Sequence, residues 1–132
     1  MIQWVDRADI VQRMHALLLE RDGGAPGLRS EESLKAALAR PHNLYEYAQA
    51  DLFHLAAAYL FALTKTHHPF IDGNKRIGFA VALVFLARNG WNLDVTERDA
   101  EQAVLRVASG EMDEEALATW IQAGCVERSE TA

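Results

Sequence analysis

Nine consecutive residues near the middle of the chain hold most of the side chains that could do chemistry. They run from His68 to Arg76 and read HPFIDGNKR. Histidine accepts a proton more readily than other side chains near neutral pH. The carboxylate of Asp72 could hold Mg²⁺, which usually binds proteins through one or two carboxylates and completes its shell with phosphate oxygens. Gly73 also lets a ligand approach the backbone closely. A proton acceptor, a carboxylate for a metal ion and a glycine within nine residues together suggest transfer of part of a nucleotide onto a hydroxyl group.

The segment stands directly before an apolar stretch, residues 77–87, which predicts a buried helix. The first N–H groups of a helix have no partner inside it, and the helix dipole adds partial positive charge there. Lys75 and Arg76 add two full positive charges, which makes this helix start a predicted phosphate site. We expect Gly73, Asn74 and Lys75 to offer backbone N–H groups, and Arg76 its planar guanidinium.

These residues resemble the signature of the Fic family, HPFx(D/E)GNGRxxR. Two positions depart from it, because Lys75 stands where Fic enzymes have a second glycine and Phe79 where they have the final arginine. That combination resembles the Doc (death-on-curing) branch of the family. The resemblance covers most of the chain, since two long runs also read like that branch: GGAPGLRSEESLKAALARP and DLFHLAAAYLFALTKTHHPFIDGNKRIGFAVALVFLARNG.

The resemblance implies an activity, cofactors and partners. Fic enzymes move the AMP part of ATP onto a target hydroxyl. Doc proteins are similar in fold but bind the nucleotide the other way round and pass its terminal phosphate to a threonine of elongation factor Tu, which arrests translation. The resemblance thus implies a toxin of a type II toxin–antitoxin system that uses ATP and Mg²⁺, silenced by a separate antitoxin. Carried over by position, it makes His68 the general base and Asp72 the Mg²⁺ ligand.

Three functions remain open from the sequence: a Doc-like protein kinase, a Fic-type adenylyltransferase that tolerates Lys75, and a non-catalytic binding module. Lysine in place of glycine adds bulk and charge where the usual α-phosphate needs close approach, and Phe79 removes one phosphate clamp. Both changes penalise the usual nucleotide orientation, which favours the kinase. The chain also lacks the pattern [S/T]xxxE[G/N] of a built-in inhibitory helix, so an inhibitor is expected to be a separate chain.

Composition sets further limits. The 132 residues predict a single domain, 1–132, and the net charge of -6 argues against a protein that coats DNA or RNA. The acidity lies in residues 94–132, with three basic and ten acidic residues, whereas residues 1–93 have ten basic and nine acidic ones. The lone Cys125 cannot form an internal disulfide. Because no apolar run is long enough to span a bilayer and no signal peptide is evident, we expect a cytoplasmic protein without membrane contact.

Apolar residues recur at helical spacing through most of the chain, which predicts an all-α fold. About six helices should pack around the 77–87 helix, with minor strands at most, at Trp4–Val5 and residues 93–95. The expected helices, with their capping residues, are one after Asp6 and Asp9 that stops at Gly23–Gly24, one from Ser30 to Arg40 ended by Pro41, one from Ala48 or Asp51 to Thr66, one from Lys75 to Asn89, one from Thr96 to Ser109, and one from Asp113 to Gly124.

The stretch from Asp22 to Ser30 has three glycines and a proline in nine residues and predicts a loop. By resemblance to the family, this loop could be the flap that docks the target peptide; a plain flexible connection is the alternative. Arg29 is the residue in it that we single out for target docking.

Overall fold

The computed structural model describes residues 1–129, and over that range it contains six α-helices, one π-helical turn and one small sheet. The elements in chain order are α1 (Ala8–Asp22), α2 (Glu31–Ala48), α3 (Leu52–Phe61), the π-helical turn η1 (Ala62–Thr66), α4 (Asn74–Arg88), β1 (Trp91–Leu93), α5 (Glu97–Ser109), α6 (Glu114–Gly124) and β2 (Cys125–Glu127). The predicted all-α class is therefore confirmed.

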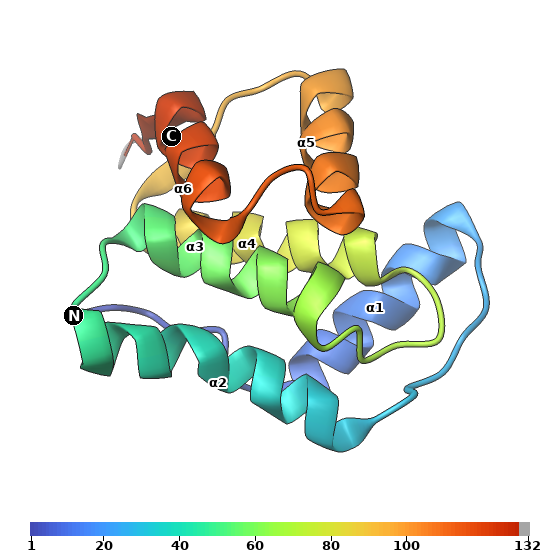
Figure 1. Ribbon diagram of the computed structural model, residues 1–132. Coiled ribbons are helices and arrows are strands. Elements are labelled where there is room, and N and C mark those ends of the chain that lie inside the picture. The colour runs from blue at the N-terminus through green and yellow to red at the C-terminus, as the bar shows by residue number, and fades with distance from the viewer. Residues whose placement is uncertain (130–132) are drawn as a thin grey trace.

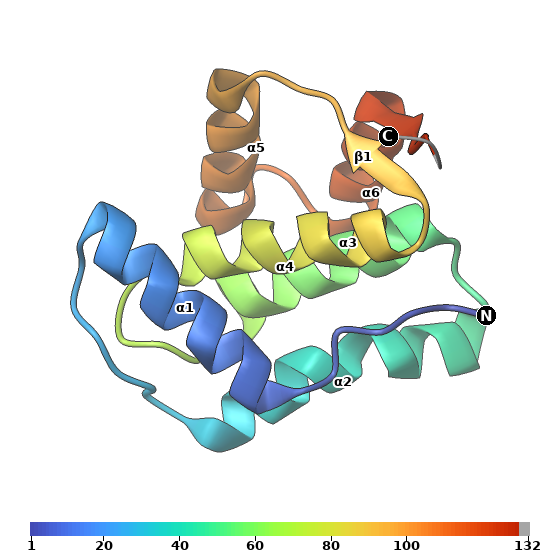
Figure 2. The same ribbon diagram turned by 180° about the vertical axis from the view of Figure 1, so that it is seen from behind.

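The helices α3 and α4 form a central pair. Figures 1 and 2 show α1 and α2 on one side of this pair and α5 and α6 on the other. Contacts run from α3 to α2, α4 and α6, and from α4 to α1 and α5. The apolar 77–87 segment lies in α4, as predicted, but α4 shares the centre with α3, where residues 55–60 are all buried. The helix that follows the HPFIDGNKR segment is thus anchored in the core.

Four of the predicted capping residues begin helices as expected. The side chains of Ser30, Asp51, Thr96 and Asp113 each accept a hydrogen bond from the backbone N–H three residues later. The capping signal predicted for the first helix is wrong, because α1 begins after Arg7 without a side-chain cap. The carboxylate of Asp9 instead accepts hydrogen bonds from the Arg7 guanidinium, at 2.7 and 3.2 Å.

The prediction that Pro41 ends the second helix is also wrong, because α2 continues to Ala48. Proline inside a helix removes one hydrogen bond and crowds the preceding turn, so packing must compensate. Pro41 is buried, and the turn beyond it is held by Trp4, whose ring stacks on His42 at 3.8 Å and meets Tyr45 edge-on at 5.8 Å. These tertiary contacts are invisible to a local sequence pattern.

The sheet differs in place from the predicted strands. β1 and β2 pair antiparallel, with Trp91 opposite Glu127 and Leu93 opposite Cys125, so the predicted 93–95 strand lies two residues earlier and its partner was missed. Trp4–Val5 is not a strand; the Val5 N–H donates to the Tyr59 hydroxyl at 2.9 Å. No helix within residues 1–129 has both the length and the apolar character needed to cross a membrane.

Candidate active site

The HPFIDGNKR segment forms the loop between η1 and α4 and the first three residues of α4. The π-helical turn ends where the His67 N–H donates to the Ala62 carbonyl at 2.9 Å, and single π-turns of this kind are frequent near functional sites. A cavity of about 350 Å³ opens on the loop. Its lining includes every residue predicted for catalysis, phosphate or metal binding: His68, Asp72, Gly73, Asn74, Lys75 and Arg76, together with Ile71.

Two side chains of the segment fix the loop to the core and so shape the cavity. Phe70 is buried and anchors the loop in the core. The side chain of Asn74 is also buried and bonds both backbone polar groups of Phe70. Its Oδ1 accepts from the Phe70 N–H at 2.9 Å, and its Nδ2 donates to the Phe70 carbonyl at 2.9 Å. The amide of Asn74 therefore ties the loop, which leaves its backbone N–H as its contribution to a phosphate site.

His15 in α1 supports the same loop, although no role was predicted for it from the sequence. The imidazole is buried and stacks on Phe70 at 3.8 Å, with an angle of 12° between the rings. Its Nε2 lies 2.7 Å from the Asp72 carbonyl oxygen, and because a carbonyl only accepts, Nε2 is the donor. A signal was present in the sequence, since His15 stands four residues from Val11 and from Leu19 and so shares their buried face.

Among residues 1–129, Asp72 is the only carboxylate that lines the cavity. Its Oδ2 accepts from the Ala25 N–H at 3.0 Å and its Oδ1 from the Gly73 N–H at 2.8 Å. These two amides, with further help from the Arg76 guanidinium and His15, hold the pKa of the Asp72 carboxyl below its ordinary value. The side chain is exposed and ionised at neutral pH.

These properties of Asp72 fit a Mg²⁺ ion that takes one ligand from the protein and the others from water and from the bound phosphates. Each oxygen of Asp72 accepts one N–H and keeps a second lone pair, which can face a cation. Within residues 1–129 no group of three or more His, Cys, Asp or Glu side chains could hold a metal. A site with one carboxylate suits Mg²⁺ that takes its other ligands from water and phosphate, and does not suit a metal caged by protein alone.

The start of α4 carries the positive charge. Gly73 precedes the helix with φ +77°, and its N–H is engaged by Asp72, so the free first-turn N–H groups begin at Asn74. Lys75 is exposed and Arg76 half-buried. Cations are slightly unfavourable at a helix N-terminus, and the two positive charges exceed the single negative charge of Asp72, so this end of α4 favours a further anion.

The glycine pair of the loop after α1 closes over these charged groups. The Gly23 carbonyl accepts from Arg76 Nη1 at 2.7 Å. Gly24 has φ +125°, and a Cβ there would lie 2.9 Å from both Arg76 Nη2 and Asp72 Oδ2. A side chain at Gly24 would therefore displace both groups, and the close approach of this turn requires glycine.

The rest of this loop pairs with the HPFIDGNKR segment like a short β-ladder. Leu28 and Phe70 form an antiparallel bridge. The Ile71 N–H donates to the Gly27 carbonyl at 3.0 Å, and the Arg29 N–H donates to the Pro69 carbonyl at 2.8 Å. The Asp22–Ser30 loop is thus hydrogen-bonded to the site. Arg29 does not line the cavity; its guanidinium donates to the carbonyls of His67 and His68.

Lys65, which precedes the HPFIDGNKR segment by three residues, does not line the cavity. The Lys65 ammonium is 3.4 Å from the Ala108 carbonyl, at the end of α5. A cation is favourable at a helix C-terminus. The positive charge at the cavity therefore comes from Lys75 and Arg76, without Lys65.

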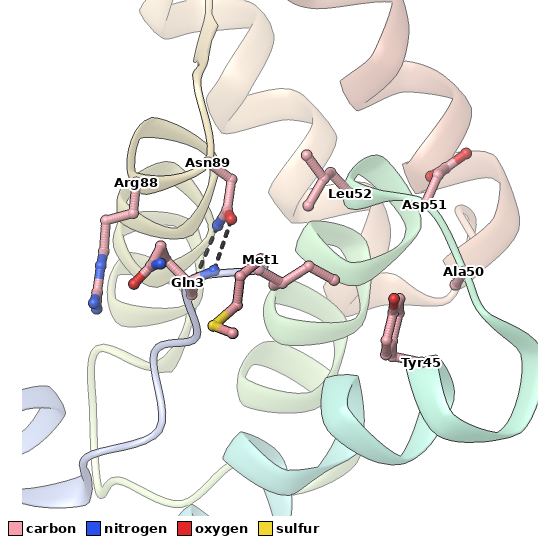
Figure 3. A pocket seen from close by; sticks show the side chains of 9 residues that line it. Met1, Gln3, Tyr45, Ala50, Asp51, Leu52, Arg88 and Asn89 are labelled. Carbon is pink, nitrogen blue, oxygen red and sulfur yellow. Dashed lines mark hydrogen bonds between the residues drawn. The ribbon is translucent and has the colours of Figure 1, made fainter.

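A larger cavity, of about 760 Å³, lies at the opposite end of α4 (Figure 3). Several of its polar groups are hydrogen-bonded to the N-terminal segment. Asn89 Oδ1 accepts from the Gln3 N–H at 2.8 Å, Asn89 Nδ2 donates to the Gln3 carbonyl at 2.9 Å, and Arg88 Nη1 donates to the Trp4 carbonyl at 3.0 Å. We assign the chemistry to the smaller cavity, because its charged groups keep unused bonding capacity.

The fold and the geometry together define a class: a helical protein whose central helix begins beside a cavity lined by a histidine, a carboxylate and two cationic side chains. Comparison with known proteins agrees. Residues 4–86 match the model of the Fic/DOC family. A protein named Toxin Doc, from Mycolicibacterium smegmatis, is 34% identical over 122 residues, which cover 89% of this chain and 90% of that protein. The chain belongs to the Fic/Doc family.

A second relative is named Protein kinase doc and comes from Escherichia phage P1. It is 38% identical over 78 residues, which cover 58% of this chain and 61% of the phage protein. The match with this relative therefore spans about three fifths of its length.

Proposed function

We propose that this protein is a Doc-like toxin that transfers the γ-phosphate of ATP to a threonine or serine hydroxyl of a translation factor. The observation that carries the proposal is the 350 Å³ cavity, in which a histidine, an ionised carboxylate and a cationic helix start meet. The names of the two relatives, Toxin Doc and Protein kinase doc, support the same activity.

In the proposed reaction, the hydroxyl oxygen of the target bonds to the γ-phosphorus of ATP while the bond between that phosphorus and the ADP oxygen breaks. The proton of the hydroxyl passes to the imidazole of His68, which is exposed at the cavity. Lys75, Arg76 and the first free N–H groups of α4 bind the phosphate oxygens. Asp72 would hold Mg²⁺, which when bound offsets the negative charge that the phosphates bring together.

The two departures from the Fic signature support phosphate transfer over AMP transfer. Lys75 is exposed at the lining of the cavity, where the signature has glycine, so its side chain occupies space that close backbone approach would need. Phe79 is half-buried and packs against the core, so position 79 offers no second guanidinium for the phosphates. A Fic-type adenylyltransferase is the second candidate, because the base and the carboxylate suit either transfer.

The proposal extends to partners and place of action. The protein substrate is elongation factor Tu, and the regulator is an antitoxin encoded as a separate chain. Both belong to the cytoplasm, where ATP and the translation machinery meet. Neither DNA, RNA nor a membrane is required.

The test is incubation with Mg²⁺, purified elongation factor Tu and ATP labelled at either the α- or the γ-phosphate. Label retained from the γ position is expected. Label retained from the α position would replace the kinase with an adenylyltransferase. No label from either position, on this target or in a ribosome-containing extract, would favour a non-catalytic binding module.

A further inference from the structure

Arg29 makes an unusual set of contacts for an exposed arginine. Its Nη2 donates to the His67 carbonyl at 3.2 Å and also to the His68 carbonyl, while its backbone N–H donates to the Pro69 carbonyl at 2.8 Å. One residue thus binds three successive carbonyl groups around His68. The Ser30 N–H adds a second bond to the Pro69 carbonyl, at 3.1 Å.

The backbone that Arg29 holds is conformationally unusual. Within residues 1–129, only two residues other than glycine have a positive φ: Gln49, which ends α2, and His68, with φ +48°. Such a conformation costs on the order of 1–3 kcal/mol outside glycine and persists where surrounding contacts determine it. His68 itself lies in neither a helix nor a strand, and the side-chain bond from Arg29 acts at its own carbonyl.

We propose that Arg29 is a positioning residue, which fixes the backbone at His68 and through it the direction of the imidazole. This inference rests on the proposed role of His68 as the base. It differs from target docking, the role that the sequence suggested, because the guanidinium is turned to the chain's own carbonyls. Both side-chain bonds come from Nη2. A lysine ammonium can also donate to carbonyls, but its side chain is shorter and lacks the fixed plane of the guanidinium, so lysine should reproduce the two bonds only in part.

The kinetic test compares Arg29→Ala and Arg29→Lys with the wild type, using γ-labelled ATP and the protein substrate. Arg7→Ala is the matched control, since Arg7 is also exposed and its guanidinium donates to the Asp9 carboxylate at the start of α1. We expect kcat of Arg29→Ala to fall about 10- to 100-fold, as for a misplaced catalytic group. KM for ATP and for the target should stay within about twofold, and Arg29→Lys should recover only part of kcat.

The result that overturns the proposal is a raised KM for the target with kcat unchanged, above all if lysine restores it, because that pattern indicates docking through charge. Wild-type kcat in Arg29→Ala would overturn it as well.

A second measurement does not depend on activity. A positive φ brings the amide proton of a residue close to its own Hα, so the intraresidue NOE of His68 should be strong in the wild type and in Arg7→Ala, and weaker in Arg29→Ala. An unchanged NOE in Arg29→Ala would overturn the inference. If the wild-type protein transfers no label, the proposed function fails, and the NOE still decides whether Arg29 holds His68.

Discussion

The two ends of α4 offer an instructive comparison, because each opens on a cavity. At the C-terminal end the cavity is the larger one, and Arg88 and Asn89 there bond to the N-terminal segment. A basic residue at that end also complements the helix dipole. At the N-terminal end the cavity is half as large, and two cations lie where the dipole disfavours them. The proposal that the N-terminal end is the functional one therefore rests on the charges there and not on the volume of the cavity.

The strongest test of this comparison is removal of the proposed base. His68→Ala should lower phosphate transfer about 10²- to 10⁴-fold, the usual contribution of a general base, and should leave the melting temperature nearly unchanged, because His68 is exposed. Rates come from γ-labelled ATP with the protein substrate. His67→Ala, which alters the neighbouring imidazole, is the control; equal losses in both variants would mean that the loop is merely disturbed.

Asn74→Ala tests whether the site depends on the two buried hydrogen bonds between the Asn74 side chain and the Phe70 backbone. The substitution leaves the N–H and the carbonyl of Phe70 without their present partner in a buried place, so the free energy of unfolding should fall by about 2–4 kcal/mol. Urea denaturation followed by circular dichroism measures it. Transfer at a temperature where the variant remains folded should also fall, and full activity would show that the loop keeps its shape without these bonds.

Asn89→Ala makes the matching change at the other end of α4. Its side chain bonds both polar groups of the Gln3 backbone and the Phe85 carbonyl at 2.8 Å. Because this end is partly exposed, we expect a smaller loss of about 1–2 kcal/mol in unfolding free energy. Transfer of label should be unaffected, and a selective loss of transfer with little loss of stability would assign a function to the larger cavity.

The smallest expected effect lies at the junction of α3 and α6. The His54 ring bonds Glu115 Oε1 at 3.0 Å and Asp51 Oδ1 at 2.8 Å, and these carboxylates raise the pKa of His54 above its ordinary value. The protonated His54 ring, bonded to these two ionised carboxylates, stabilises the fold fully below about pH 6.5. The contribution is lost as the pH rises through the higher pKa of His54 in the folded state.

Thermal unfolding between pH 5.5 and 8.5 measures this contribution, which we expect to be at most about 1 kcal/mol because the pair is near the surface. His54→Gln should flatten that part of the pH profile. A profile that remains the same in the variant would assign the dependence to another group.

The helical class, four of the caps and the residues of the cavity could be predicted from the sequence, since each depends on neighbours in the chain. Pro41 and His15 show where that reasoning ends. The helix survives Pro41 because Trp4 packs beyond it, and His15 acquires a role because Asp72 comes to lie 2.7 Å from its Nε2. Contacts between residues tens of positions apart decide both, and no local pattern encodes them.

The pairing of residues 27–30 with residues 69–71 decides which parts of the chain are needed to rebuild the site in another protein. Some forty residues separate the two partners, so the hydrogen bonds that hold the loop around His68 come from the distant segment between α1 and α2. A peptide that spans η1 and α4 would contain every residue of the signature and none of the bonds from Ala25, Arg29 or His15. Grafting the proposed active site onto another scaffold therefore requires both loops and helix α1, which carries His15.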